Sequence, residues 1–395
     1  MNETADILII GGGVIGVSIA YHLAQRGLGR IVLLERDSLA CGSTGRSVAT
    51  IDLLTFQPNA VELYAKSGEF FDQCDQILGA ECGFVETGSI VLAGPRQESG
   101  LLAAMQKVQA AGVEVQSLSI EALRKLEPAV TLDGVVSASY APRAGYADPV
   151  LTTQALANAA RRMGVNIQQG RAVTRLRRAG KQVFGVETAT RDIKALVVIV
   201  AAGAWSGNLL RTAAIELDLQ PVRHPVVALR RPPHAASPRH SLLDLTTGIY
   251  ARPESDRLIL LGSINPDVGY DPITPDDGAG YVHDEYVLWV MERFVQRFPA
   301  LEAGELTRGW AGIMTISPDW QPVLGKWPDC PNLYCATGFS GKGFQISPAV
   351  GELMARLIAG DPKASKLLAP FAPTRFDNGR LLRTENDGQA YGLLA

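Results

Sequence analysis

The chain has 395 residues, of which 47% are hydrophobic and 19% are charged, and its formal net charge is −3. At about 150 residues per domain, this length predicts two or three domains or one large, elaborated domain. The composition excludes a charge-rich disordered chain, and the nearly balanced charge excludes nucleic acid as the expected main partner. The 40 glycines follow no collagen period, so they need a local explanation.

The cysteines and the N-terminal segment bear on compartment and membrane. Five cysteines without a disulfide-dense pattern indicate a reducing compartment. Cys330 and Cys335 are separated by four residues, but no second Cys or His pair lies near enough in sequence to complete a zinc site, so we expect no metal. The apolar segment Ile7 to Ala24 is interrupted by glycines and lacks the basic region of a signal peptide. We therefore expect a cytoplasmic protein without a transmembrane segment.

The first forty residues carry the pattern of a dinucleotide-binding unit. A buried strand at Ile7 to Ile10 leads into Gly11-Gly12-Gly13-Val14-Ile15-Gly16, which fits G-x-G-x-x-G, and a helical pattern follows as far as Gly27. A second strand, Ile31 to Leu34, ends at Glu35, where an acid can bind a ribose. The glycines permit a tight turn, close approach to a pyrophosphate and close helix packing. The acid disfavours NADP, whereas NAD and FAD both remain open.

Later segments have the composition of cofactor-contacting loops. Residues 42–47, GSTGRS, form a small-residue loop with one arginine. An apolar strand from Ala195 to Val200 runs into AAGAWS, and Leu333 to Ala336 runs into TGFSGKGF, followed by a helical stretch from about Pro348 to Ala359. Val165 to Glu187 and Ile249 to Ser263 read as short strands.

Together with WAGIMTISPDWQPVLG at 310–325, these motifs resemble the FAD-dependent amine and amino-acid oxidoreductases of the D-amino-acid oxidase superfamily, in particular the group of sarcosine oxidase β-subunit, glycine oxidase and proline or hydroxyproline dehydrogenase. The resemblance covers about residues 5 to 360. It implies an α/β fold with an α+β substrate domain. A discontinuous, Rossmann-like FAD domain of the glutathione-reductase type would comprise 1–80, 148–215 and 325–370. A substrate domain with a mixed or antiparallel sheet would comprise 81–147 and 216–324, and 371–395 would form a loosely ordered tail.

The resemblance implies FAD as the cofactor. Relatives that bind flavin covalently use a His beside the early glycine loop or a Cys in the late segment, and this chain offers Arg46 or Ser47 and Gly312 instead, so we expect noncovalent FAD. The residues that we assign to the cofactor are Gly11, Gly13, Val14, Ile15, Gly16, Glu35, Arg36, Ser43, Thr44, Gly45, Arg46, Ser47, Val173, Ala202, Gly203, Trp205, Gly312, Gly338, Gly341, Lys342, Gly343 and Phe344.

The resemblance also implies a reaction. In such enzymes a hydride passes from the carbon beside nitrogen to flavin N5, and the resulting imine is hydrolysed. The expected substrate is a small-molecule secondary amine, imino acid or amino-acid derivative. Lys342 stands where relatives often carry a His, and we expect its cation to stabilise the reduced flavin. We expect Tyr250 and Tyr146 to line the substrate pocket, and the five histidines to be structural or on the surface.

The carboxylate partners of the family are missing at their usual places. Where relatives carry an Arg or a Lys, this chain has Met314, Asp52 and Gln345. An unpaired buried carboxylate is costly. Either Arg252 or Arg46 therefore binds the substrate carboxylate, or the substrate has none there and Asp52 faces a cationic group. A helix-capping or solvated Asp52 without a substrate role is the other interpretation of that residue.

The electron acceptor and two alternative functions stay open. The Lys that activates oxygen in monomeric sarcosine oxidases is replaced by an aliphatic residue near Leu260, so the acceptor is O₂, a quinone or a partner subunit. A quinone would place the protein at the periphery of the inner membrane, and an oligomer is compatible with the sequence. Alternatively, the chain is an FAD-bearing electron-transfer or structural subunit of a heteromeric dehydrogenase, or a 2-hydroxy-acid dehydrogenase on the same fold.

Overall fold

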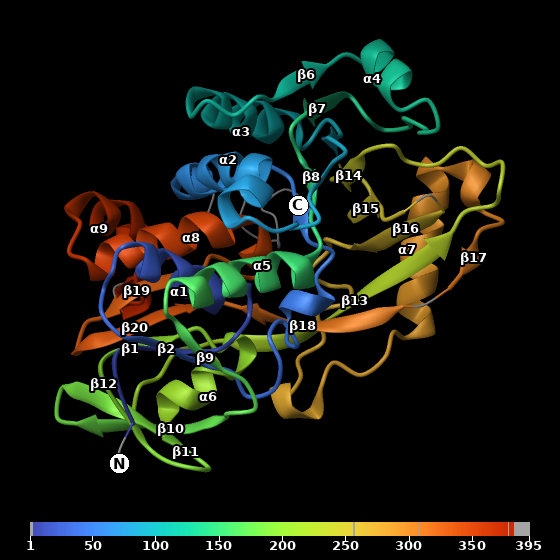
Figure 1. The fold of residues 1–395 in the computed structure, drawn as a ribbon. Coiled ribbons are helices and arrows are strands. Elements are labelled where there is room, and N and C mark those ends of the chain that lie inside the picture. The colour runs from blue at the N-terminus through green and yellow to red at the C-terminus, as the bar shows by residue number, and fades with distance from the viewer. Residues whose placement is uncertain (1–2, 256, 308, 378, 383–395) are drawn as a thin grey trace.

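Two large sheets, built from interleaved segments of the chain, make up the fold (Figure 1). The computed structural model describes residues 3–255, 257–307, 309–377 and 379–382. The eight-stranded sheet draws its strands from residues 3–34, 166–200 and 323–337, and the nine-stranded sheet draws its strands from residues 89–141 and 220–316. The domain boundaries given above stay a prediction.

The eight-stranded sheet is parallel at its centre. Its strands run in the order β10-β11-β12-β1-β2-β9, with β20 beside β12 and β19 beside β20. The parallel pairs are β1 with β2, β1 with β12, β12 with β20 and β2 with β9. The carboxyl ends of these strands therefore meet at one edge. The bounds are β1 (Glu3–Ile10), β2 (Ile31–Leu34), β9 (Asn166–Gln168), β10 (Val173–Ala179), β11 (Gln182–Thr188), β12 (Ile193–Val200), β19 (Val323–Trp327) and β20 (Cys330–Thr337).

Both faces of this sheet are covered, as the continuous apolar strands predict. On β1, Ile7 and Ile9 pack with the helices α1 (Val14–Gln25), α5 (Pro149–Arg162) and α8 (Gly343–Ile358). Leu8 and Ile10 pack on the opposite face with α6 (Ser206–Arg211) and the β10–β11 hairpin. Figure 1 shows these two layers on either side of β1, β2 and β12.

The nine-stranded sheet is mixed and mainly antiparallel. Its order is β17-β13-β16-β15-β14-β5-β7-β6, with β18 beside β13, and β14 with β5 is a parallel pair. The helix α7 (Asp284–Arg297) packs on it through Val290 and Phe294. The bounds are β5 (Ser89–Ala93), β6 (Gln116–Leu118), β7 (Ser137–Ala141), β13 (Gln220–Arg230), β14 (Ser241–Asp244), β15 (Ile249–Pro253), β16 (Leu258–Ser263), β17 (Glu305–Leu306) and β18 (Trp310–Ile316). The two sheets together confirm the predicted fold class.

A small third sheet joins β3 (Thr50–Ile51), β8 (Gly145–Tyr146) and β4 (Val85–Glu86). The remaining helices are α2 (Val61–Leu78), α3 (Glu98–Ala110), α4 (Ile120–Leu126), α9 (Pro362–Leu368) and α10 (Thr374–Asp377). Among the described residues, no helix is long and apolar enough to cross a membrane. All five cysteines are free thiols.

The C-terminal part departs from the sequence expectations. The helix α8 begins at Gly343 rather than near Pro348, because Phe344 and Ile346 are buried in the core and hold the first turn in place. The first part of the predicted tail packs against the molecule, since Arg375 is buried and forms an ion pair with Asp319. Residues 383–395 lie outside the described residues.

Candidate cofactor and substrate site

A cavity of about 980 Å³ lies where the carboxyl edge of the parallel sheet meets the nine-stranded sheet. One side is formed by the residues that follow β1, β2, β12 and β20. The other side is formed by residues of β13, β14, β15 and β18, and by Thr50 and Asp52 at β3, where Asp52 accepts a hydrogen bond from Ser89 beside β14. We call the first side the dinucleotide end and the second side the substrate end. Clefts at the carboxyl ends of parallel strands are the usual ligand sites of such sheets.

Glycines shape the dinucleotide end. Gly11 has a φ of +113°, and a Cβ atom added there would lie 2.3 Å from the carbonyl oxygen of Ala201. A Cβ atom on Gly16 would lie 2.0 Å from the carbonyl oxygen of Gly11. The turn after β1 and the start of α1 therefore pack too closely for any side chain at these two positions. Glycine is required for the packing of this turn, and Gly11 and Gly13 present backbone without side chains to the cavity, as a dinucleotide site requires.

Glu35 ties this turn to the end of β2. Its Oε2 accepts a hydrogen bond from the Gly12 N–H at 2.6 Å, and its Oε1 accepts one from the Asp37 N–H at 2.8 Å. Oε1 also accepts a weak hydrogen bond from the Cys41 thiol at 3.8 Å, whereas Oε2 keeps a second lone pair for another donor. The predicted role of Glu35 as a ribose acceptor is compatible with this arrangement.

The GSTGRS loop is fixed to β18. The Ser43 hydroxyl donates to the Ile313 carbonyl, and the Trp310 indole N–H donates to the Arg46 carbonyl at 2.9 Å. The exposed Arg46 guanidinium donates to two carbonyls of its own loop, those of Cys41 and Gly42. It is therefore engaged locally rather than extended toward the substrate end.

Charged and aromatic groups meet beside the dinucleotide end. The Arg36 guanidinium lies 4.4 Å from the centre of the Trp205 ring and pairs with Asp37 and Asp276 at 3.0 and 3.3 Å. The Trp205 indole N–H donates to Asp276 at 2.6 Å. Arg36, Trp205, Asp276 and Val173 all line the cavity.

At the substrate end, Asp52 brings a carboxylate into the lining. Its backbone N–H donates to Gln345 Oε1 at 3.1 Å, and its carboxylate accepts hydrogen bonds from Ser89 at 3.3 Å and Thr50 at 3.4 Å. Burial raises the pKa of Asp52 to about 6, partly opposed by the two hydroxyl donors. In the part of the chain that the structure describes, Asp52 forms no ion pair.

His224 is the second titratable group of the substrate end. Burial lowers its pKa to about 4, so the ring is neutral at physiological pH. Its ring stacks 6.2 Å from that of Tyr250 and lies 4.9 Å from that of Tyr270, measured between centroids. A hydrogen bond joins the imidazole to the Gly269 backbone, and Nδ1 has no partner among the described residues.

The structure brings most of the predicted cofactor residues together. All of them line the cavity except Gly16, Gly45 and Lys342. Gly16 and Gly45 serve packing, since a Cβ atom on Gly45 would lie 2.6 Å from the Ala40 carbonyl oxygen. Of the predicted catalytic residues, Tyr250, Met314 and Asp52 line the cavity, whereas Arg252 and Lys342 do not.

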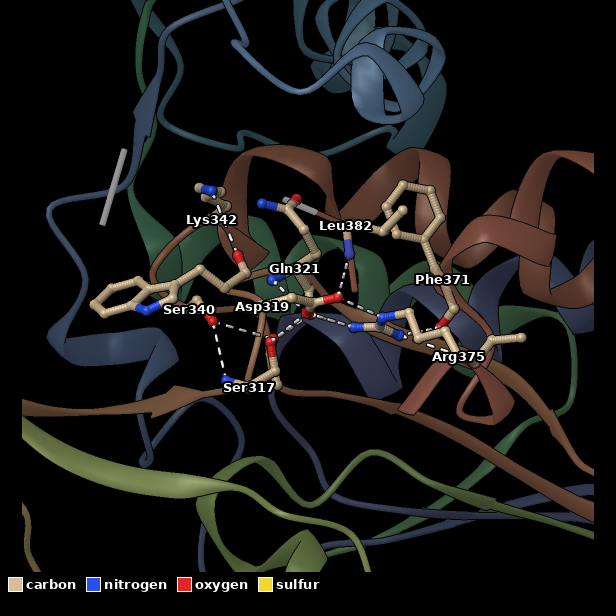
Figure 2. Close-up of polar contacts among 11 residues, drawn as sticks. Ser317, Asp319, Gln321, Ser340, Lys342, Phe371, Arg375 and Leu382 are labelled. Carbon is tan, nitrogen blue, oxygen red and sulfur yellow. Dashed lines mark hydrogen bonds and ion pairs between the residues drawn. The ribbon is translucent and has the colours of Figure 1, made fainter. Parts of the chain in front are cut away.

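Both cations outside the lining contact other parts of the protein. Arg252 is 4% exposed, donates to the Val48 carbonyl at 2.6 Å and pairs with Glu254. It also lies 4.0 Å from the ring centre of Tyr146, which is outside the lining too. Lys342 Nζ donates to the Trp320 carbonyl at 3.4 Å, beside the loop that carries Ser317 and Asp319 (Figure 2). The roles given above for Arg252 and Lys342 stay predictions.

The sequence pattern indicates no catalytic role for His224, and it marks Gln345 only as the residue that stands where relatives carry a Lys. His224 reaches the cavity because β13 pairs with β18, which places His224 opposite Gly312, 88 positions further along the chain. The alternation of β13 gives which residues share a face, but not which face meets the cofactor. Knowledge that β13 pairs with the strand that carries Gly312 would have identified His224 as a residue of the cavity.

Comparison with known proteins now adds to this geometry. A family model described as FAD dependent oxidoreductase (DAO) matches residues 6–357. The chain is 30% identical to the sarcosine oxidase subunit beta of Arthrobacter sp., over 96% of this chain and 93% of that protein. It is 28% identical to the 4-methylaminobutanoate oxidase (formaldehyde-forming) of Paenarthrobacter nicotinovorans, over 90% of this chain but only 44% of that protein.

Two solved structures are also similar. The L-proline dehydrogenase from P. horikoshii is 27% identical with a TM-score of 0.86, covering 96% of this chain and 99% of that one. The glycine oxidase from Geobacillus kaustophilus is 26% identical with a TM-score of 0.81, covering 95% and 99%. The chain therefore belongs to the DAO family of FAD-dependent oxidoreductases.

FAD is the cofactor of this family, and the residues of the cavity fit it. The glycine turn leaves backbone where a Cβ atom would clash, Glu35 Oε2 has a lone pair to spare, and α1 begins beside the turn. Gly11, Gly13, Glu35 and the loop from Ser43 to Ser47 are the residues that would hold the dinucleotide.

Proposed function

We propose that this protein oxidises a C–N bond in a secondary amine, an imino acid or an amino-acid derivative. The observation that carries the proposal is the continuity of one cavity from the glycine turn at Gly11 to a substrate end that contains His224, Tyr250 and Asp52. The relatives and neighbours named above support it, since their names refer to sarcosine, 4-methylaminobutanoate, proline and glycine.

The residues of the substrate end would orient the amine. Bound FAD would supply the acceptor for a hydride from the carbon beside nitrogen, and water would hydrolyse the resulting imine. His224 stays neutral because of its burial, so its imidazole can accept a hydrogen bond from the substrate N–H and fix the direction of the nitrogen lone pair. Tyr250 and Met314 contribute apolar surface that excludes water from the reacting carbon.

Several finer points belong to the same proposal. FAD is bound noncovalently, and yellow colour that stays in an acid-precipitated pellet would refute this. The electron acceptor is O₂, a quinone or a partner subunit; the last is supported by the likeness to a protein named as a β subunit. A cytoplasmic location, or a peripheral one at the inner membrane, remains part of the proposal.

Anaerobic mixing tests the reaction. The FAD-loaded protein is mixed with N-methyl amino acids, proline, D-amino acids, opines and simple secondary amines, while the visible flavin band is followed. Bleaching by one of them at a saturable rate is the expected result. A flavin that only dithionite reduces would favour the alternative function, an electron-transfer or structural subunit.

A further inference from the structure

The substrate end of the cavity presents an anion without a protein cation. The Asp52 carboxylate receives hydrogen bonds only from the Ser89 and Thr50 hydroxyls among the described residues, at 3.3 and 3.4 Å. Each oxygen therefore keeps lone pairs for a further donor. Asp52 is half-buried in the cavity wall, where a positive charge placed against its carboxylate would be only partly screened by water.

The backbone around Asp52 holds the carboxylate in this position. Ala49 and Leu53, on either side of the short strand β3, both have left-handed conformations, with φ values of 53° and 61°. Gln345 accepts the Asp52 N–H at 3.1 Å and donates to Tyr64 at 3.3 Å. Non-glycine residues adopt such conformations at a cost that the surrounding contacts must offset. The direction of Asp52 is therefore built into the fold.

The positive charges of the cavity lie elsewhere. Its lining contains three arginines and no lysine. Arg36 pairs with Asp37 and Asp276, and Arg171 pairs with Glu3 at 2.7 Å. Arg46 is held by the carbonyls of its own loop. All three follow strands or loops of the dinucleotide end, so none of them is placed to bind a substrate carboxylate beside Asp52.

We propose that Asp52 binds a second, cationic nitrogen of the substrate, which makes the substrate class diamines or longer polyamines rather than α-amino acids. The inference rests on the proposed function, because it places the oxidised C–N bond of the same molecule in the same cavity. The Ser89 and Thr50 hydroxyls keep the carboxylate oriented, and the neutral ring of His224 adds no charge that would repel a second ammonium group.

Three compounds of similar length test this proposal. N-methylputrescine carries a second ammonium group, N-methylpentylamine replaces that group with a methyl group, and 4-(methylamino)butanoate places a carboxylate there. Anaerobic flavin reduction and calorimetric binding are measured for each compound with the wild-type protein, Asp52→Asn and a matched control, Asp218→Asn. Asp218 is an exposed residue before β13 and does not line the cavity.

We expect the diamine to bind most tightly of the three compounds and to reduce the flavin fastest. Asp52→Asn should weaken diamine binding about 30-fold or more, as expected when one partner of a buried charge pair is neutralised. The same variant should change the binding of N-methylpentylamine by less than about threefold, because no charge pair is lost. Asp218→Asn should behave like the wild-type protein with all three compounds.

The results separate this inference from the proposed function. A preference for 4-(methylamino)butanoate, or equal losses for all three compounds in Asp52→Asn, overturns the cationic subsite and leaves amine oxidation standing. Diamine binding that depends on Asp52 without flavin reduction by any amine supports the subsite and overturns the proposed reaction. Absence of diamine binding to the wild-type protein overturns the subsite.

Discussion

The two ends of the cavity are built by different means. At the dinucleotide end, backbone that follows parallel strands forms much of the surface, with Gly11 and Gly13 in the lining and Gly16 packed behind the turn. At the substrate end, side chains such as Asp52 and His224 form the surface, and they come from distant parts of the chain, Asp52 after β3 and His224 on β13. The first end is fixed by the spacing of residues within one unit, whereas the second depends on the pairing of distant strands. Variants at each end should therefore fail in different ways.

The largest effect is expected from Gly11→Ala. Its Cβ atom would lie 2.3 Å from the Ala201 carbonyl oxygen, and its φ is +113°. Clash and strain together should reduce FAD affinity by about 100-fold or more, corresponding to about 3 kcal/mol. The measurement is the ratio of flavin to protein absorbance after purification, with circular dichroism to check the fold.

Gly207→Ala is the matched control for Gly11→Ala. A Cβ atom at Gly207 would lie 3.7 Å from the Leu217 carbonyl oxygen, an ordinary contact. This variant should keep its FAD. Equal FAD binding by both variants would contradict the claim that the dinucleotide end requires glycine at position 11.

The next effect concerns the loop between the two sheets, which joins β18 to β19. Its Asp319 carboxylate accepts hydrogen bonds from Arg375 at 2.7 and 2.8 Å and from the Leu382 N–H at 3.0 Å (Figure 2). Burial works to raise the pKa of Asp319, but Arg375 and these N–H donors hold it below its usual value. The stabilisation is therefore present at neutral pH and is lost as the pH falls below 3.8.

Arg375→Met leaves that carboxylate buried without its cation. The free energy of unfolding should fall by about 3–5 kcal/mol at neutral pH, as measured by urea denaturation. The control Lys125→Met breaks an exposed pair with Glu121 and should cost less than about 1 kcal/mol. Equal losses in the two variants would show that the C-terminal segment does not anchor this loop.

His224→Gln should affect catalysis without loss of the cofactor. The imidazole is replaced by an amide that cannot hold the substrate nitrogen in the same direction, so flavin reduction should slow about 10- to 100-fold. The stopped-flow rate at saturating amine measures this, and the flavin content should stay unchanged. The exposed His234→Gln serves as control. A loss of FAD with no change in the reduction rate would contradict this role, because it would show that His224 supports cofactor binding at the dinucleotide end rather than the substrate.

Asp52→Asn should stabilise the protein at neutral pH. The pKa of Asp52 is raised from 3.8 to about 6, so the folded protein binds more protons than the unfolded chain between these values, and stability falls as the pH rises through them. Removing the charge should therefore add about 1–2 kcal/mol above pH 6, and the gain should vanish below pH 3.8. Melting temperatures across this range measure it; a pH-independent difference would contradict the buried carboxylate.

The smallest effect is expected from Lys342→Met. The ammonium lies beside the cavity rather than in its lining, and it donates to the Trp320 carbonyl. Loss of its positive charge should lower the two-electron reduction potential of the flavin by about 10–30 mV, which corresponds to no more than about 1.4 kcal/mol. Potentiometry with dye standards measures this shift, and an unchanged potential would count decisively against the predicted role.

Much of the dinucleotide end could be predicted because its chemistry is local. The strands at Ile7–Ile10 and Ile31–Leu34, the glycines between them and Glu35 lie within one continuous unit, and the structure assembles them as expected. The predicted start of α8 near Pro348 is wrong. Proline is common in the first turn of a helix, but here the helix begins five residues earlier, at Gly343, because Phe344 and Ile346 are buried in the core.

The sequence by itself determined the dinucleotide unit and the family, because glycine spacing and a terminal acid are properties of neighbouring residues. Only the tertiary structure decided which charged side chains line the cavity. It showed Arg252 engaged with Val48 and Glu254, and Asp52 facing the cavity beside Gln345. The physical reason is that a pocket lined by side chains depends on the register between distant strands, and a shift of one residue would turn the same side chains away.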